Sequence, residues 1–169
     1  MKALILIADG FEDIQLFTVW HRLQEEGVKV TLANGSGKPS TGLHGYQVEA
    51  DMPIQELNPS EYDILYIPGG GSPERLRLRE KAVDVVRTFM DEDRVIAIIG
   101  HGAQVLISAG ALDGKALTCA PGIRDDVRAA GAQYKDEGVV LSGNLISARS
   151  SDDLPRLNQM IVAALTALA

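Results

Sequence analysis

The sequence predicts an α/β domain in which helices cover both faces of a mostly parallel sheet. Short apolar runs alternate along the chain with longer segments whose apolar residues recur at helical spacing. The main apolar runs are continuous, as expected for strands buried on both faces. The length of 169 residues suits one compact domain over residues 1–169, and no linker or repeat divides it.

The predicted strands and helices each have a characteristic local pattern of apolar residues. Continuous or alternating apolar residues predict strands over 3–8, 28–33, 46–50, 63–68, 95–99, 116–119, 139–141 and 145–148. Helical spacing of apolar residues predicts helices over 11–26, 80–91, 104–109 and 154–168. Gly27 and Gly110 follow two of these helices and favour their termination, and the stretch 35–42 is rich in turn residues.

Composition and charge exclude several classes of function. A net charge of −7 and a pI near 4.9 argue against binding to nucleic acid or to an anionic membrane. The apolar start is too short for a membrane span and lacks a cleavage site, so we expect a cytoplasmic protein. A single cysteine excludes an internal disulfide and a cysteine-built zinc site. No metal-ligand cluster or dinucleotide fingerprint is found, so no metal or organic cofactor is predicted.

Three loops are predicted to form the functional edge of the sheet. In parallel α/β sheets, ligands bind beyond the carboxyl ends of the strands. The loops at 9–13, 69–74 and 100–103 each follow a predicted buried strand. The candidate functional residues are therefore sought in these three loops.

The stretch around Gly100 has the layout of a nucleophile elbow. An apolar strand turns abruptly into a helix at Gly100-His101-Gly102, and the following amides are suited to an anion or a developing oxyanion. The apex residue is nevertheless glycine. By spacing alone, Gly100 also fits a simple tight turn.

The other candidates each have a structural and a functional interpretation. The run Gly69–Gly71 is either a bend or a binding loop, and it is no P-loop because no Gly-Lys-Ser/Thr follows. Glu12 is either a helix-start residue or a catalytic acid or base. His21 and His44 are predicted to be surface or hydrogen-bonded histidines, and Cys119 a small buried apolar residue.

Taken together and in order, these motifs resemble the ThiJ/PfpI superfamily, specifically its short PfpI-type intracellular protease/deglycase branch. The resemblance covers almost the whole chain. It is carried by Glu12, Pro68-Gly-Gly-Gly with Pro73-Glu74-Arg75, Ala97-Ile-Ile-Gly-His-Gly-Ala-Gln-Val-Leu106, Pro121-Gly-Ile-Arg-Asp-Asp126 and Gly143-Asn-Leu-Ile-Ser-Ala-Arg149.

The resemblance implies a flavodoxin-like three-layer sandwich and a reactive cysteine at the elbow apex. Glu12 would hydrogen-bond that thiol and exchange protons with the substrate, and His101 would be the adjacent histidine. Glu74 would reach the histidine of a neighbouring subunit, an arrangement that goes with dimers assembling into a hexamer. The amides near Gly70, Gly71 and His101 would form the oxyanion pocket.

The chain departs from this family pattern at the nucleophile position. Gly100 stands where the family has cysteine, and Ala103 replaces the proline common after His-Gly. The family activities are peptide hydrolysis, cofactor-free conversion of methylglyoxal to lactate, and removal of early glycation adducts, all by thiolate attack. With glycine at position 100 this covalent chemistry is not available, and the expected substrates are small aldehydes or glycated compounds.

Three hypotheses fit these residues. In the first, a working cysteine-dependent enzyme was altered at position 100, since Glu12, Glu74 and His101 are all present. In the second, the chain is a natural pseudoenzyme that binds a small molecule or a protein partner in a stress response. In the third, Glu12 and His101 perform hydratase-like acid/base chemistry, or Cys119 serves as a displaced nucleophile.

Overall fold

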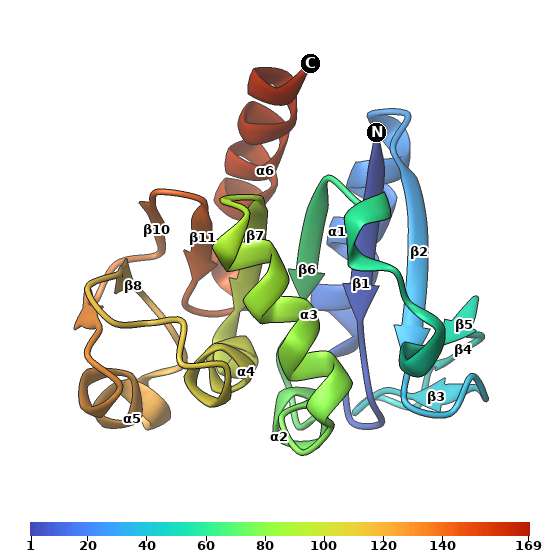
Figure 1. Cartoon of the computed structure of the whole chain (residues 1–169), viewed down its shortest axis with the longest axis horizontal. Helices are drawn as coiled ribbons and strands as arrows, with labels where there is room; N and C mark the ends of the chain where they lie inside the picture. Colours follow the sequence, from blue (N-terminus) through green and yellow to red (C-terminus); the bar gives the residue numbers. More distant parts are fainter.

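The computed structural model describes residues 1–169 and places a seven-stranded sheet between layers of helices (Figure 1). The helices are α1 (Asp13–Glu25), α2 (Ser72–Leu76), α3 (Glu80–Asp91), α4 (Ala103–Ser108), α5 (Arg124–Ala129) and α6 (Leu154–Leu168). The main sheet contains β1 (Lys2–Leu6), β2 (Lys29–Asn34), β5 (Met52–Pro53), β6 (Ile64–Ile67), β7 (Val95–Ile99), β10 (Val139–Ser142) and β11 (Leu145–Ala148). Two small sheets pair β3 (Ser40–Thr41) with β4 (Gln47–Val48) and β8 (Ala116–Leu117) with β9 (Gln133–Tyr134).

The main sheet is mostly parallel, as predicted. Its strand order is β10-β11-β7-β6-β1-β2-β5, and every neighbouring pair is parallel except β10 with β11. The strands β1, β6 and β7 therefore end at one edge of the sheet, close to α2 and α4, while both chain termini lie at the opposite end (Figure 1). No helix combines the length and the apolar character that crossing a membrane requires.

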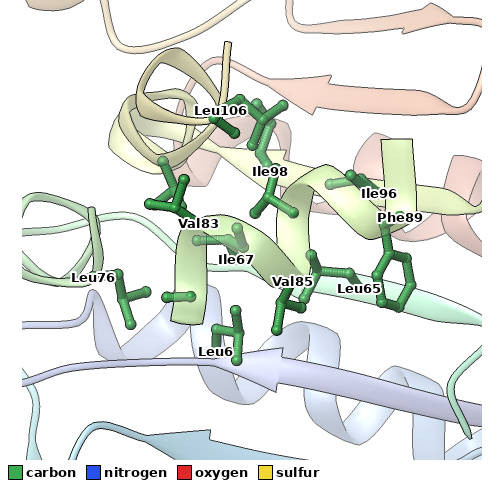
Figure 2. Close-up of a cluster of buried hydrophobic side chains, with 14 of the residues drawn as sticks. Leu6, Leu65, Ile67, Leu76, Val83, Val85, Phe89, Ile96, Ile98 and Leu106 are labelled. Atoms are coloured by element: carbon green, nitrogen blue, oxygen red, sulfur yellow. The ribbon is translucent and has the colours of Figure 1, made fainter. Parts of the chain in front are cut away.

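The central strands are buried on both faces because alternate side chains enter two separate cores. In β7, Ile96 and Ile98 join the core beneath α3 and α4, whereas Ala97 and Ile99 join the core beneath α1 and α6. Figure 2 shows the first of these cores, where Phe89 and its neighbours on α3 pack over β1, β6 and β7. Burial on both faces explains why these strands have continuous apolar sequences.

The structure differs from the sequence prediction mainly in short elements. The helices over 80–91 and 154–168 and the strands over 95–99 and 145–148 have the predicted bounds. The predicted strand over 46–50 is instead the two-residue β4 of a hairpin, and α2, α5 and β9 had no sequence prediction. Elements of two to six residues have little periodicity of their own and depend on the contacts around them.

Candidate functional site

The three predicted loops meet at the carboxyl edge of the sheet. The amide of Glu12 donates to the carbonyl of Gly69 at 3.1 Å, and the amide of Gly71 donates to the carbonyl of Gly10 at 2.8 Å. On its other side, Gly69 lies against the elbow, because a Cβ on it would be 2.9 Å from the Ile99 carbonyl oxygen. The loop at 9–13 (the first loop), the loop at 69–74 (the glycine loop) and the turn at 100–103 (the elbow) thus lie together as one candidate site.

Gly100 adopts the left-handed backbone conformation expected of an elbow apex. Strand β7 ends at Ile99, a 3₁₀ turn covers Gly100–Gly102, and α4 begins at Ala103. The φ of Gly100 is +59°, in the left-handed region. The nearest atoms to a Cβ at this position would be the side-chain Nε2 of Gln15 at 3.9 Å and the backbone carbonyl oxygen of Arg149 at 4.0 Å. A Cβ at position 100 would therefore make only ordinary van der Waals contacts, although the positive φ disfavours any residue other than glycine.

Gln15 borders the space beside Gly100, and the sequence analysis missed it. This buried residue of α1 accepts a hydrogen bond from the Gly69 amide at 2.8 Å through Oε1. Its Nε2 donates to the hydroxyl of Ser151 at 3.1 Å. The available signal was a polar residue at position 15, three residues after Glu12 and on the inward face of a predicted helix.

Glu12 lies at the N-cap of α1, and its two carboxylate oxygens have different surroundings. Oε1 is 3.2 Å from Nε2 of His44, whereas Oε2 is buried without a hydrogen-bond partner. Burial, followed by the nearby negative charge of Glu12, raises the pKa of the Tyr66 phenol well above its usual value. The oxygen left without a partner is the one that could accept and return a proton.

The backbone amides of Gly70 and Gly71, both predicted for the oxyanion pocket, differ in their hydrogen bonding. The amide of Gly70 has no hydrogen-bond partner within the chain, and φ at this residue is +83°. The amide of Gly71 donates instead to the Gly10 carbonyl, so this N–H is already engaged within the chain, and its part in the pocket stays a prediction. The reason for this engagement is the close pairing of the first loop with the glycine loop, which uses the Gly71 N–H.

The remaining predicted residues lie around this edge. His101 is half-buried in the 3₁₀ turn that follows β7. Glu74 lies in the first turn of α2, is exposed, and makes no hydrogen bond or ion pair within the chain. Its predicted contact with a neighbouring subunit stays a prediction.

Cys119 belongs to the apolar core and not to the site. The Ala120 amide donates to the Gly100 carbonyl at 3.0 Å, so the backbone next to Cys119 touches the elbow. The thiol itself is 0% exposed and joins the core beneath α3 and α4. Burial, together with the negative charge of Asp126, raises the pKa of the Cys119 thiol to about 11, although Arg128 opposes this. A protonated, enclosed thiol is a poor nucleophile, so the hypothesis of a displaced nucleophile is not supported.

One group of side chains has the spacing of metal ligands. Ligand atoms of Glu12, Asp13 and His44 all lie within 4.8 Å of one another. However, Asp13 already accepts backbone hydrogen bonds through both oxygens, from His44 at 2.9 Å and Tyr46 at 3.2 Å. These bonds give Asp13 a structural task, and we assign no metal to the group.

A hollow of about 820 Å³ opens beside Glu12, on the side of the β3–β4 hairpin. Its walls include Phe17, His21, His44 and Tyr46, and the Phe17 and Tyr46 rings meet edge to face with centroids 5.4 Å apart. The lining residues of this hollow include neither Gly100 nor His101. Glu12 thus borders both the hollow and the loops of the elbow site.

Comparison with known proteins places this chain in a family. Residues 1–164 match the model of the DJ-1/PfpI family. The deglycase PfpI of Pyrococcus furiosus is 47% identical over 154 residues, which cover 91% of this chain and 93% of that protein. The Bacillus subtilis protein YraA is 38% identical over 159 residues, which cover 94% of this chain and 94% of that protein. Its name describes it as a cysteine protease on a provisional basis.

Solved structures show the same fold. A two-domain protein from Anabaena variabilis, with DJ-1/ThiJ/PfpI-like and ferritin-like domains, has a TM-score of 0.96 and 33% identity. The match covers 98% of this chain and 50% of that one, so this chain spans about half of that protein. Schizosaccharomyces pombe DJ-1 has a TM-score of 0.88 at 22% identity, covering 96% of this chain and 90% of that chain. These likenesses confirm the predicted flavodoxin-like sandwich, and the chain belongs to the DJ-1/PfpI family.

Proposed function

We propose that this member of the DJ-1/PfpI family has a deglycase-type site for small α-oxoaldehydes or glycated compounds, and that Gly100 deprives the site of its nucleophile. The observation that carries the proposal is the space at position 100. Its backbone has the elbow conformation, and a Cβ would meet nothing closer than 3.9 Å. The first atom of a cysteine side chain would therefore meet no neighbour closer than ordinary van der Waals contact.

The groups around this space match what the reaction needs. A thiolate adds to the aldehyde carbon of methylglyoxal, and the resulting oxyanion takes a proton. A carboxylate then moves a proton from this carbon to its neighbour, and water hydrolyses the resulting thioester to lactate and the free thiol. The free oxygen of Glu12 suits the proton transfer, and the unpaired amide of Gly70 suits the oxyanion. With glycine at position 100, the first carbon–sulfur bond cannot form.

The relatives named as deglycases favour small substrates over folded protein. We also propose self-association, as a dimer or a hexamer. Glu74 supports this, because it is an exposed carboxylate at the start of α2 with no partner in its own chain. In an assembly, Glu74 would complete the site by reaching His101 of the neighbouring copy.

Two alternative functions would give different results in the experiment described below. A pseudoenzyme would bind the aldehyde or a protein partner without turnover, and Ala103 in place of the usual proline favours this modestly. Acid/base chemistry by Glu12 and His101 would give turnover in the chain with Gly100 itself. Both alternatives make predictions that differ from those of a site that lacks only its nucleophile.

The test is methylglyoxal consumption, with chiral detection of lactate, by this chain and by its Gly100→Cys variant. Loss of a nucleophile costs on the order of 10⁴ to 10⁶ in turnover, so we expect a gain of that order in the variant. Gly100→Ala is the matched control, because it adds a side chain without a thiol and should stay inactive. The same gain should require Glu12, so Gly100→Cys combined with Glu12→Gln should lose most of it.

Each contrary result has a meaning. If the variant and the parent are both inert, the glyoxalase assignment is wrong and the pocket serves another substrate or only binds. If the parent turns over as fast as Gly100→Cys, the acid/base hypothesis replaces the thiol one.

A further inference from the structure

The β3–β4 hairpin is hydrogen-bonded to the loop that contains Glu12. The Gly10 amide donates to the Thr41 carbonyl at 2.8 Å, and the Leu43 amide donates to the Phe11 carbonyl at 2.9 Å. The turn at 42–45 is therefore held against the start of α1. A segment some thirty residues away in sequence becomes part of the surroundings of Glu12.

Asp13 fixes this turn. Its buried carboxylate accepts the amide of His44 at 2.9 Å and the amide of Tyr46 at 3.2 Å. Gly42 packs directly on the same carboxylate, because a Cβ there would lie 2.5 Å from its atoms. Any larger residue at position 42 would push the turn away from α1.

The outcome is a contact between the His44 imidazole and one oxygen of Glu12. Nε2 of His44 lies 3.2 Å from Oε1, and the side chains are 68% and 15% exposed respectively. The other titratable groups close to Glu12 are the carboxylate of Asp13 and the buried phenol of Tyr66. His21 lines the same hollow as His44, but its ring is bonded to Gln24 at 3.1 Å.

We propose that His44 is a positioning residue for Glu12. The terminal torsion of a glutamate is soft, so an unrestrained carboxylate rotates freely. By binding Oε1, His44 fixes the carboxylate plane and keeps the buried Oε2 as the oxygen that handles the substrate proton. The assignment of proton transfer to Glu12 rests on the proposed function, whereas the restraint by His44 is a property of the chain as it stands.

The first test uses the chain with Gly100 in place. The ¹³C signal of the Glu12 side-chain carboxyl, assigned with Glu12→Gln, is followed by NMR as a function of pH. We expect His44→Leu to move this signal and its pH profile, and His44→Gln, which keeps a hydrogen-bond donor, to preserve more of the parent behaviour. His21→Leu is the matched control in the same hollow and should leave the signal in place. A Glu12 signal that His44→Leu leaves unchanged overturns the proposal.

The second test asks whether the restraint matters for turnover, in the Gly100→Cys background. Misplacing a catalytic group by about 1 Å costs up to about 100-fold in rate, so His44→Leu should lower kcat about 10- to 100-fold with little change in KM. Because the effect passes through Glu12, it should disappear when Glu12→Gln is already present. An equal loss in both backgrounds would contradict the proposal. If Gly100→Cys itself shows no turnover, the proposed function fails, and the NMR result still decides the role of His44.

Discussion

Two glycine segments face each other at the carboxyl edge of the sheet, and they are glycine for different reasons. At Gly70, a Cβ would lie 2.4 Å from the Gly10 carbonyl oxygen and 2.7 Å from the Glu12 amide nitrogen. At Gly100, the nearest atom would be 3.9 Å away. Both residues have positive φ. The close approach of the backbone at 10–12 thus requires glycine at position 70. At position 100 no neighbouring atom excludes a Cβ, and only the positive φ favours glycine.

The comparison indicates that the fold requires glycine at position 70, whereas the residue at position 100 bears on the chemistry of the site. The glycine loop lets the first loop and the elbow come together, so its close approach builds the site. At the elbow, glycine leaves a position that in the proposed function would hold the nucleophile, and the neighbouring groups stand around it. The proposed loss of thiol chemistry is therefore compatible with an intact fold.

The largest expected effect is that of Gly70→Ala on stability. Positive φ costs about 1 to 2 kcal/mol for a residue with a Cβ, and overpacking against backbone adds about 1 to 3 kcal/mol, so we expect a loss of about 3 kcal/mol. Gly100→Ala is the matched control, since it carries the φ cost alone, about 1 kcal/mol. Urea unfolding of both variants measures the difference. Equal losses would mean that the two glycines are not distinguished by space.

A second test concerns Cys119, the only thiol of the chain, which is buried in the core and not at position 100. Burial raises the pKa of Cys119 to about 11. Above about pH 9 the unfolded chain has lost this proton while the folded chain retains it, so the free energy of unfolding falls as pH rises towards 11. The expected fall is about 1.4 kcal/mol per pH unit.

The control for this effect is Cys119→Ala, which should lack that part of the alkaline slope. Denaturant unfolding at several pH values between about 8 and 11 compares the two chains. Parallel pH dependences would show that the Cys119 thiol ionises as easily in the folded state as in the unfolded one. That result would also reopen Cys119 as a candidate nucleophile.

The smallest effect is expected at the third residue of the glycine run. Gly71 has a φ of −85°, and a Cβ on it would meet only the Gly10 carbonyl oxygen, at 3.8 Å. Gly71→Ala should therefore change the free energy of unfolding by no more than about 0.5 kcal/mol. A loss as large as that of Gly70→Ala would show that the whole run, and not Gly70 alone, requires glycine.

The sequence predicted those parts of the fold that local pattern controls. The helices α3 and α6 and the strands β7 and β11 have the expected bounds, because their burial imposes a strong periodicity or a continuous apolar run. A sharp turn at Gly100 was also predicted from the apolar strand that runs into a helix, and its positive φ fits both the elbow and the tight-turn interpretation.

Residues that enter the site through long-range contacts were not predicted. Gln15 bonds to Gly69, 54 positions away, and His44 reaches Glu12 across a hairpin whose strands are two residues long. The polar residue on the inward face of a predicted helix could have marked Gln15, but nothing in the sequence pattern indicates that its partner is Gly69 or that His44 reaches Glu12. The Gln15 contact exists because parallel pairing of the strands brings the first loop and the glycine loop to one edge, and the His44 contact exists because the β3–β4 hairpin is hydrogen-bonded to the first loop.

The sequence alone determined that position 100 has no side chain, and hence that no covalent bond to substrate can form there. That conclusion needs only the identity of the residue. The tertiary structure decided the rest: that the space beside Gly100 is open, that Gly70 and not Gly71 has a free amide, and that one oxygen of Glu12 is held by His44. Space, orientation and hydrogen-bond partners depend on segments distant in sequence, and these segments meet only in the folded chain.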